Sequence, residues 1–303
     1  MPIWALQTLL PAIDSNNQTT KLMYFEKLLT RKHYLRTEFL VRKLSKVDIA
    51  KWLLEVGYFP ESNILPPKFE PCNFVLQQKP YHSLDEKIIW RKLASISYPK
   101  SRLTSRNFSI QDPKLYHDIV YYLHLEWDKI LNIIFSPTNK FYSYSMPIPV
   151  STTEQGALGR LRAGRLIYEW IKMAENDLVV DSNYYRYLAR TDIANFYSSV
   201  YTHSIAWAVE GRDVSFADKK LKLLGNKLDK LMQCSNDGKT NGIAIGSALS
   251  DLIAEILLSR IDCEVSKDLS GIDFCAVRFK DDYRILAQSE EDAQKILSAL
   301  ALR

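Results

Sequence analysis

The segment FCAVRFKDDYRILA, residues 274–287, is the part of the chain from which the rest can be interpreted. Two apolar runs of strand length, rich in Val, Ile, Phe and Tyr, flank the pair Asp281 and Asp282. The pattern predicts a tight β-hairpin with two carboxylates at its tip. Adjacent carboxylates repel each other unless a cation lies between them, and hard oxygen ligands suit Mg²⁺. An Asp-rich hairpin turn that binds no metal has the same pattern, so this segment alone leaves both interpretations open.

A third carboxylate lies at the end of another strand candidate. Residues 187–193 have the composition of a strand that ends in Asp192, and Phe196 and Tyr197 follow shortly after it. An acid at the end of one strand can meet an acidic hairpin on a neighbouring strand. Two metal ions about 3.5–4 Å apart, held by shared carboxylates, catalyse in-line phosphoryl transfer. We therefore expect Asp192 to join Asp281 and Asp282 in one catalytic centre.

Between these acids lies a glycine-containing segment, NGIAIGSALSD, at residues 241–251. Gly242 and Gly246 permit unusual backbone conformations and the close approach of a ligand. An amphipathic helix is predicted after them, because apolar residues recur at helical spacing. These residues are Leu249, Leu252, Ile253, Ile256, Leu257 and Ile261.

In order and spacing, the three segments resemble motifs A, B and C of reverse transcriptases. Asp192 with Phe196 and Tyr197 is similar to motif A, residues 242–250 to motif B, and residues 279–282 to motif C. Ala244 and Ile245 replace the usual Pro and Gln of motif B, which puts template handling in doubt but spares the carboxylates.

Residues 201–205 and 224–229 further resemble the bacterial abortive-infection and defence-associated reverse transcriptases, the so-called unknown groups. The resemblance covers about residues 141–303.

This resemblance implies an α/β fold with the palm and fingers of a right-hand polymerase. The palm, a small antiparallel sheet backed by helices, is expected at about 186–212 and 241–303. The fingers are expected at 141–185 and 213–240, after a mostly helical N-terminal region at 1–140. No thumb is evident before the sequence ends at 303, so we expect a truncated chain or one that depends on a separate chain.

The resemblance also assigns roles to individual residues. Asp192, Asp281 and Asp282 are the implied catalytic acids, and these three with Ile193 are the implied ligands of Mg²⁺, or of Mn²⁺ in its place. Tyr197 would pack under the sugar and exclude a 2′-hydroxyl, unless it is simply a core tyrosine. Other implied nucleotide contacts are Phe196, Gly246, Arg160 and Arg165, of which the arginines could equally be exposed residues at a helix start.

A basic stretch interleaved with aromatic residues runs from about residue 21 to 52. Its candidate nucleic-acid contacts are Lys21, Arg31, Lys32 and Arg36, because cations bind phosphates and rings stack on bases. A pair of amphipathic helices with a solvated basic face has the same pattern, and we expect this for most of the residues. His203, alone in a predicted helix, is expected to be structural.

The composition is that of a globular protein with 303 residues, of which 47% are hydrophobic and 25% charged. A net charge of +5 is compatible with a polyanionic partner. Four scattered cysteines predict reduced, mostly buried thiols in a cytoplasmic protein, without a zinc site. No basic signal-peptide region opens the chain and no apolar run reaches the length of a membrane span, so no membrane contact is expected.

Three functions remain open from the sequence. The first is a DNA polymerase of reverse-transcriptase type in antiphage defence, which transfers nucleotides from dNTPs to a 3′-hydroxyl or a protein hydroxyl, with an RNA template or none. The second is a dormant subunit that binds RNA or DNA in a defence complex, with a non-coding RNA, a partner protein or further copies of itself. The third is a two-metal nuclease. The intact acids argue against dormancy, and the full motif set argues against a nuclease.

Overall fold

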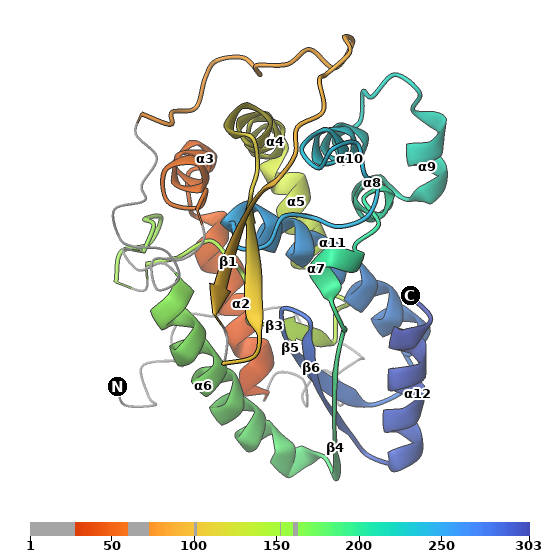
Figure 1. Ribbon diagram of the computed structural model, residues 1–303. Helices are drawn as coiled ribbons and strands as arrows, with labels where there is room; N and C mark the ends of the chain where they lie inside the picture. The colour runs from red at the N-terminus through yellow and green to blue at the C-terminus, as the bar shows by residue number, and fades with distance from the viewer. Residues whose placement is uncertain (1–27, 60–72, 100–101, 152, 160–162) are drawn as a thin grey trace, which may run out of the picture.

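The computed structural model describes residues 28–59, 73–99, 102–151, 153–159 and 163–303. The helices are α2 (Leu29–Arg42), α3 (Lys46–Glu55), α4 (Pro113–Leu125), α5 (Trp127–Ile134), α6 (Ala163–Asp181), the 3₁₀ turn η2 (Ser182–Tyr184), α7 (Phe196–Ser199), α8 (His203–Glu210), α9 (Arg212–Ala217), α10 (Leu224–Cys234), α11 (Ala248–Asp268) and α12 (Glu290–Ala301). The strands are β1 (Ala94–Pro99), β2 (Ser105–Ile110), β3 (Phe141–Ser143), β4 (Tyr187–Asp192), β5 (Phe274–Phe279) and β6 (Asp282–Ala287). The protein is thus a mixed α/β structure (Figure 1).

A four-stranded sheet of order β3-β5-β6-β4 contains both segments that carry the predicted acids. The hairpin predicted at 274–287 is confirmed as β5 and β6, and the predicted strand that ends in Asp192 is confirmed as β4. The three strands in the expected palm range, β4, β6 and β5, are antiparallel as expected, while β3, which lies outside that range, extends the sheet by pairing with β5 in parallel. Parallel pairing requires a long connection between the strands, and the chain from β3 to β5, which includes α11, provides it.

The hairpin turn contains two residues, because Phe279 pairs with Asp282 and leaves Lys280 and Asp281 between them. Lys280 has a φ of 53°, and such positive angles match the twist that tight hairpins require. The turn therefore presents Asp281 at the end of the sheet, beside the first residue of β6.

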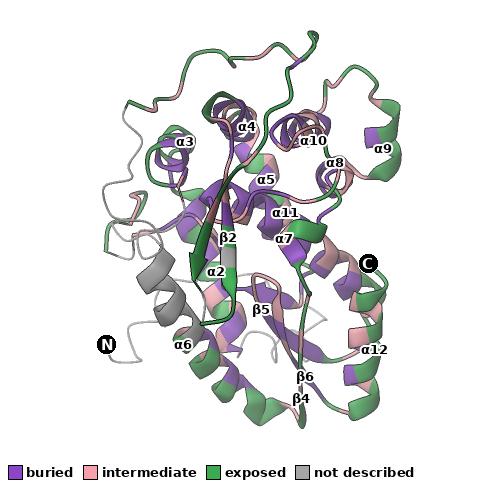
Figure 2. Ribbon diagram, in the orientation of Figure 1, coloured by how far each residue is buried: buried purple, intermediate pink, exposed green. Residues whose placement is uncertain are grey.

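The two faces of the sheet are covered differently. On one face, Tyr283 and Ile285 pack with Val265 of α11 and Ile296 of α12. On the other face, α6 covers only the side of β5 and β6, where Leu178 packs with Val277 and Leu286. Figure 2 shows the consequence, since β5 is coloured as buried and β4 as mostly exposed. The face of β4 that points away from α12 is open.

Above the sheet, helices from both parts of the sequence share one hydrophobic core. Helices α3, α4, α8 and α10 gather at the top of Figure 1, and α11 runs between them and the sheet. The helix predicted after Gly246 is confirmed as α11, although it is buried on most sides and not only on one face. The Ser289 hydroxyl caps α12 by accepting from the Asp292 N–H. His203 is structural as expected, because its Nδ1 lies 2.6 Å from Asp229 Oδ2 and links α8 to α10.

The expectation that residues 1–140 are mostly helical misses the antiparallel hairpin of β1 and β2. Its strands contain Ile96, Tyr98 and Phe108, residue types that favour extended structure. Strand β2 is joined to the predicted motif B segment, because the Ser109 N–H donates to the Ile245 carbonyl and the Ile245 N–H donates to the Ser109 hydroxyl.

Two further expectations concern thiols and membranes. Cys234, Cys263 and Cys275 are free and buried, as predicted, and Cys72 lies outside the described residues. In the part of the chain that the structure describes, no helix combines the length and the apolar character needed to cross a bilayer.

A substitution at Gly225 tests the close contact between α8 and α10. A Cβ atom at Gly225 would lie 2.8 Å from the Ala206 Cα and 3.1 Å from the Val209 Cβ. Because backbone atoms cannot turn aside, Gly225→Ala should lower the free energy of unfolding by about 1–3 kcal/mol, although alanine favours helices. Chemical denaturation measures the change. Gly271→Ala is the control, since nothing lies within 4 Å of its added atom, and an equal effect of both substitutions would contradict the contact.

Candidate functional site

Asp192 and Asp282 oppose each other across two neighbouring strands. Asp192 is the last residue of β4 and Asp282 the first of β6, and the antiparallel register pairs them directly. Directly opposed residues project from the same face of a sheet, with Cβ atoms about 4.5–5.5 Å apart. Asp192 is exposed, and the Asp282 side chain is 49% exposed. The register therefore brings two of the predicted acids together on the open face of the sheet.

A backbone hydrogen bond holds Asp281 close to Asp192. The Ile193 N–H donates to the Asp281 carbonyl oxygen at 3.1 Å, which ties the hairpin turn to the residue that follows Asp192. The Ile193 side chain packs against the hydrophobic core. The structure thus brings together all four residues predicted as metal ligands, with Ile193 contacting the turn through its N–H.

Electrostatic repulsion acts within this group of acids. Burial raises the pKa of Asp282, and the charges of Asp192 and Asp281 raise it further, while Arg284 and Arg190 lower it. The two arginines outweigh the repulsion from the two acids, so the net rise in the pKa of Asp282 is due to its burial.

The donor atoms suit Mg²⁺ or Mn²⁺, which prefer carboxylate oxygens. Among the described residues, no three His, Cys, Asp or Glu side chains already form a group that could hold a metal ion. Mg²⁺ is usually bound by one or two carboxylates together with the phosphates of a substrate. Asp192, Asp281 and Asp282 would supply those carboxylates.

Tyr197 is held beside the acids by a residue that the sequence did not single out. Its hydroxyl donates to Asp251 Oδ1 at 2.5 Å, and Lys280 Nζ lies 3.1 Å from Asp251 Oδ2. Burial and the charge of Asp251 raise the pKa of Tyr197 far above its ordinary value, so the hydroxyl keeps its proton. Asp251, in the first turn of α11, thereby links α7 to the hairpin turn. The Tyr197 ring is partly buried and contacts the main core, next to the buried Phe196.

The predicted motif B segment lies directly against the segment of Tyr197. The Gly242 N–H donates to the Val200 carbonyl and the Ile243 N–H to the Tyr197 carbonyl, both at 2.8 Å. Gly246 has a φ of 114°, a conformation that side chains other than glycine rarely adopt. Its position shortly before α11 fits the expected close approach of a ligand to the backbone.

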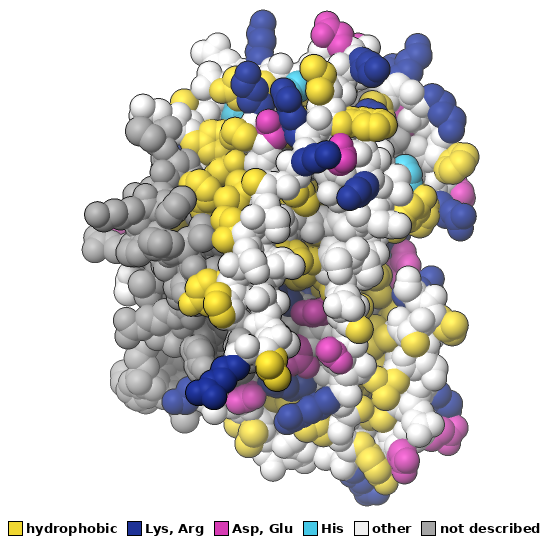
Figure 3. Space-filling view, in the orientation of Figure 1, with side chains coloured by type: hydrophobic (Ala, Val, Ile, Leu, Met, Phe, Trp, Pro, Cys, Tyr) yellow, Lys and Arg dark blue, Asp and Glu magenta, His cyan; other side chains and the backbone are white. Residues whose placement is uncertain are grey.

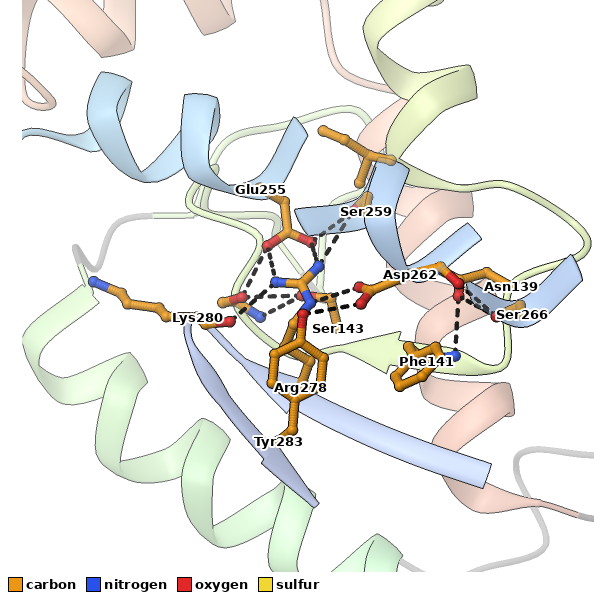
Figure 4. Close-up of polar contacts among 12 residues, drawn as sticks. Asn139, Phe141, Ser143, Glu255, Ser259, Asp262, Ser266, Arg278, Lys280 and Tyr283 are labelled. Atoms are coloured by element: carbon orange, nitrogen blue, oxygen red, sulfur yellow. Dashed lines mark hydrogen bonds and ion pairs between the residues drawn. The ribbon is translucent and has the colours of Figure 1, made fainter. Parts of the chain in front are cut away.

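A fully buried arginine, Arg278, connects the hairpin to α11 (Figure 4). The two Nη atoms of Arg278 donate to the two carboxylate oxygens of Glu255 at 3.0 and 2.9 Å. Its Nε donates to Asp262 Oδ2 at 2.6 Å, and Tyr283 donates to the other oxygen of Asp262. Nη1 also donates to the Lys280 carbonyl at 3.3 Å. The Arg278–Tyr283 pair, one step before the pair that closes the turn, is thus bonded to α11, and the bond to the Lys280 carbonyl holds the turn itself.

The sequence contains a signal for this support that the motif comparison did not use. Asp251, Glu255 and Asp262 lie within about 40° of one another around a helix of 3.6 residues per turn, although their neighbours are largely apolar. Acids on one side of an apolar helix predict a buried basic partner. Arg278 and Lys280 are these partners.

The structure does not bring the predicted basic residues of α2 to the acids. Arg31, Lys32 and Arg36 lie on α2, which contacts β3, and β3 and β4 form opposite edges of the sheet. Arg31 instead lines a cavity of about 330 Å³ between α2 and α5, which none of the three acids lines. Lys21 and Arg160 lie outside the described residues, and Arg165 is placed only as a backbone position in α6.

Asp262 should make the stability of the protein depend on pH. Burial raises its pKa from about 3.8 to about 6 despite the opposing charge of Arg278. Between these two pKa values the folded protein holds a proton that the unfolded chain has lost. The stability that this proton contributes is fully present below the unfolded pKa and is lost as the pH rises through about 6. Relative to Asp262→Asn, which resembles the protonated side chain, the wild type should lose up to about 3 kcal/mol of unfolding free energy between pH 4 and pH 7.5.

Denaturation by urea at both pH values measures this difference. Asp273→Asn, an exposed aspartate before β5, controls for the substitution itself. A constant difference between the wild type and Asp262→Asn at both pH values would contradict the raised pKa.

No family model matches the chain, and no curated protein matches it. Among solved structures, the chain is similar to apo telomerase from Candida tropicalis truncated from its C-terminal domain, with 12% sequence identity and a TM-score of 0.38. The match covers 71% of this chain and 46% of the telomerase chain, so the chain spans less than half the length of that neighbour.

Proposed function

We propose that this protein is a nucleotidyltransferase of reverse-transcriptase type that joins deoxynucleotides to a hydroxyl group. The observation that carries the proposal is the direct opposition of Asp192 and Asp282 across β4 and β6, with Asp281 in the adjoining turn. Convergent acids with hard oxygen atoms are what phosphoryl transfer with two metal ions requires. The palm would then comprise about residues 186–212 and 241–303, and the fingers 141–185 and 213–240.

In this proposal the carboxylates of Asp192 and Asp281 hold Mg²⁺ or Mn²⁺, and Asp282 assists them. The ions, when bound, lower the pKa of the attacking hydroxyl and stabilise charge on the phosphates. The chain's own residues position the reactants. The Ile193–Asp281 bond and the Arg278 contacts hold the turn, while Asp251 fixes the Tyr197 ring on the side where a nucleotide sugar would lie.

Lys280 gives the turn a positive charge that could reach a triphosphate. Its Nζ is bound to Asp251, and its side chain is 29% exposed, so it is neither fully buried nor free in solvent. The sequence resemblance adds three further parts to the proposal. They are a role in antiphage defence, an RNA template or none, and priming by a 3′-hydroxyl or a protein hydroxyl. A nucleic-acid-binding subunit without chemistry is the alternative, and the exposure of Asp192 favours the enzyme, because an exposed acid can reach a substrate.

Asp281→Asn tests the proposed chemistry. The substitution keeps the shape of the side chain but removes the charge that holds the cation, so incorporation of nucleotides should fall to the level of a reaction without enzyme. The assay supplies each dNTP and Mg²⁺, with and without an RNA template, and sequences the products. Removing a charge from a repelling group should leave the thermal unfolding temperature unchanged or raise it.

Asp273→Asn is the matched control, since it changes an exposed aspartate at the other end of the same hairpin. If Asp281→Asn incorporated nucleotides at the rate of this control, the proposed catalytic role of Asp281 would be contradicted. A wild-type chain that binds nucleic acid yet incorporates nothing under all conditions would favour the subunit without chemistry.

Substitutions of Tyr197 distinguish a role in sugar selection from a purely structural role in the core. If the ring excludes a 2′-hydroxyl, Tyr197→Ala should raise the incorporation of ribonucleotides relative to deoxyribonucleotides. Tyr197→Phe keeps the ring and loses only the bond to Asp251, so its ratio should stay close to that of the wild type. Equal ratios for all three proteins, with activity retained, would assign Tyr197 to the core alone.

A further inference from the structure

Two arginines form a pair directly beside the acids on the open face of the sheet. Arg190 of β4 and Arg284 of β6 are opposed in the register, two residues before Asp192 and two after Asp282. Side chains two residues apart on a strand lie on the same face, about 6.7 Å from each other along it. The pair therefore forms a basic row next to the acidic one. On the face shown in Figure 3, acidic side chains gather near the middle and basic ones lie below them.

This arrangement is unfavourable in the protein alone. Like charges placed directly opposite each other across two strands destabilise a sheet. Arg284 is partly balanced, since its Nη1 lies 3.3 Å from Glu175 Oε1 and its Nη2 lies 3.7 Å from Asp282 Oδ2. Its Nε is buried and has no hydrogen-bond partner among the described residues. Arg190 is exposed and makes no ion pair with any described residue.

The unmet Arg284 Nε and the exposed guanidinium of Arg190 make this row suitable for binding an anion. A guanidinium presents its N–H groups in a planar fork that matches the oxygens of a phosphate. Glu175 of α6 competes for Arg284, whose side chain is 16% exposed, but the Glu175 side chain is 52% exposed and can turn into solvent. An incoming phosphate could therefore replace it at small cost.

We propose that Arg190 and Arg284 bind a backbone phosphate of a nucleic-acid strand whose end lies at Asp192 and Asp282. The site is defined by two opposed arginines, of which Arg190 is exposed and Arg284 is largely buried, with 16% of its side chain exposed. It adds a phosphate-binding position to the chain that is distinct from the acids and from the basic residues of α2.

The position of the row distinguishes a strand from a nucleoside triphosphate. Along the chain, β4 leads from Arg190 through Asp192 to α7, which carries Tyr197. The acids thus separate the arginines from Tyr197 and the Gly246 segment. If the nucleotide lies near Tyr197, a choice that rests on the proposed function, then the arginines contact the strand to be extended.

Binding of a labelled oligonucleotide to the full chain tests this site without any synthesis. Fluorescence anisotropy with single-stranded DNA and RNA, across a series of salt concentrations and without dNTPs, gives the dissociation constant and its salt dependence. Arg190→Ala should raise the dissociation constant about tenfold and reduce the slope of log K against log salt by about 0.7. Arg190→Lys should keep the slope and recover only part of the affinity, because lysine lacks the fork.

Lys295→Ala is the matched control, because it removes an exposed positive charge from α12, on the covered side of the sheet. Arg190 is exposed and lies opposite a like charge, so its replacement should leave the unfolding temperature unchanged or raise it. An effect of Arg190→Ala no larger than that of Lys295→Ala would overturn the site.

A second arm measures the binding of a dNTP to the same variants. Unchanged dNTP binding by Arg190→Ala, together with weaker oligonucleotide binding, supports a strand phosphate. If Arg190→Ala weakened only the binding of the dNTP, the assignment of this site to a strand phosphate would be overturned. A wild-type chain that shows no synthesis, but whose oligonucleotide binding depends on Arg190, would refute the proposed function and leave this site standing.

Discussion

The Arg278 guanidinium, buried between Glu255 and Asp262, is the interaction on which the candidate site depends. Its partners are carboxylates of α11, so β5 cannot slide along this helix without leaving charges buried and unpaired. Breaking such a buried pair costs about 3–5 kcal/mol. A firm support of this kind is needed where a short turn must hold carboxylates close together, since their mutual repulsion acts to separate them.

The acids form a boundary between two kinds of surface. On one side, Asp251 fixes Tyr197, and the segment with Gly246 is bonded to the same region. On the other side, Arg190 and Arg284 present positive charge on the open half of the sheet. The basic residues of α2 belong to neither surface, because α2 lies against β3 at the opposite edge. Any contact of α2 with nucleic acid would therefore be separate from the site of the acids.

The sequence predicted the parts of the fold that have a local pattern. The hairpin of β5 and β6 and the end of β4 at Asp192 follow from apolar runs that acids interrupt. Strand β3 has only three residues, and its parallel pairing is decided by tertiary contacts that no local period reveals. Arg278 reads as an ordinary strand residue, and only the acids on one side of α11 indicate that it is buried. The opposition of Arg190 and Arg284 depends on a register that the sequence leaves open.

The most direct test of the central claim is to locate a bound cation. A crystal grown with Mn²⁺ and a dNTP, measured at a wavelength where manganese scatters anomalously, shows the metal position without relying on activity. The account predicts anomalous density within about 2.0–2.2 Å of carboxylate oxygens from both Asp192 and the Asp281–Asp282 turn. Ordered dNTP with no metal density between these carboxylates, or metal bound only elsewhere on the protein, would contradict it.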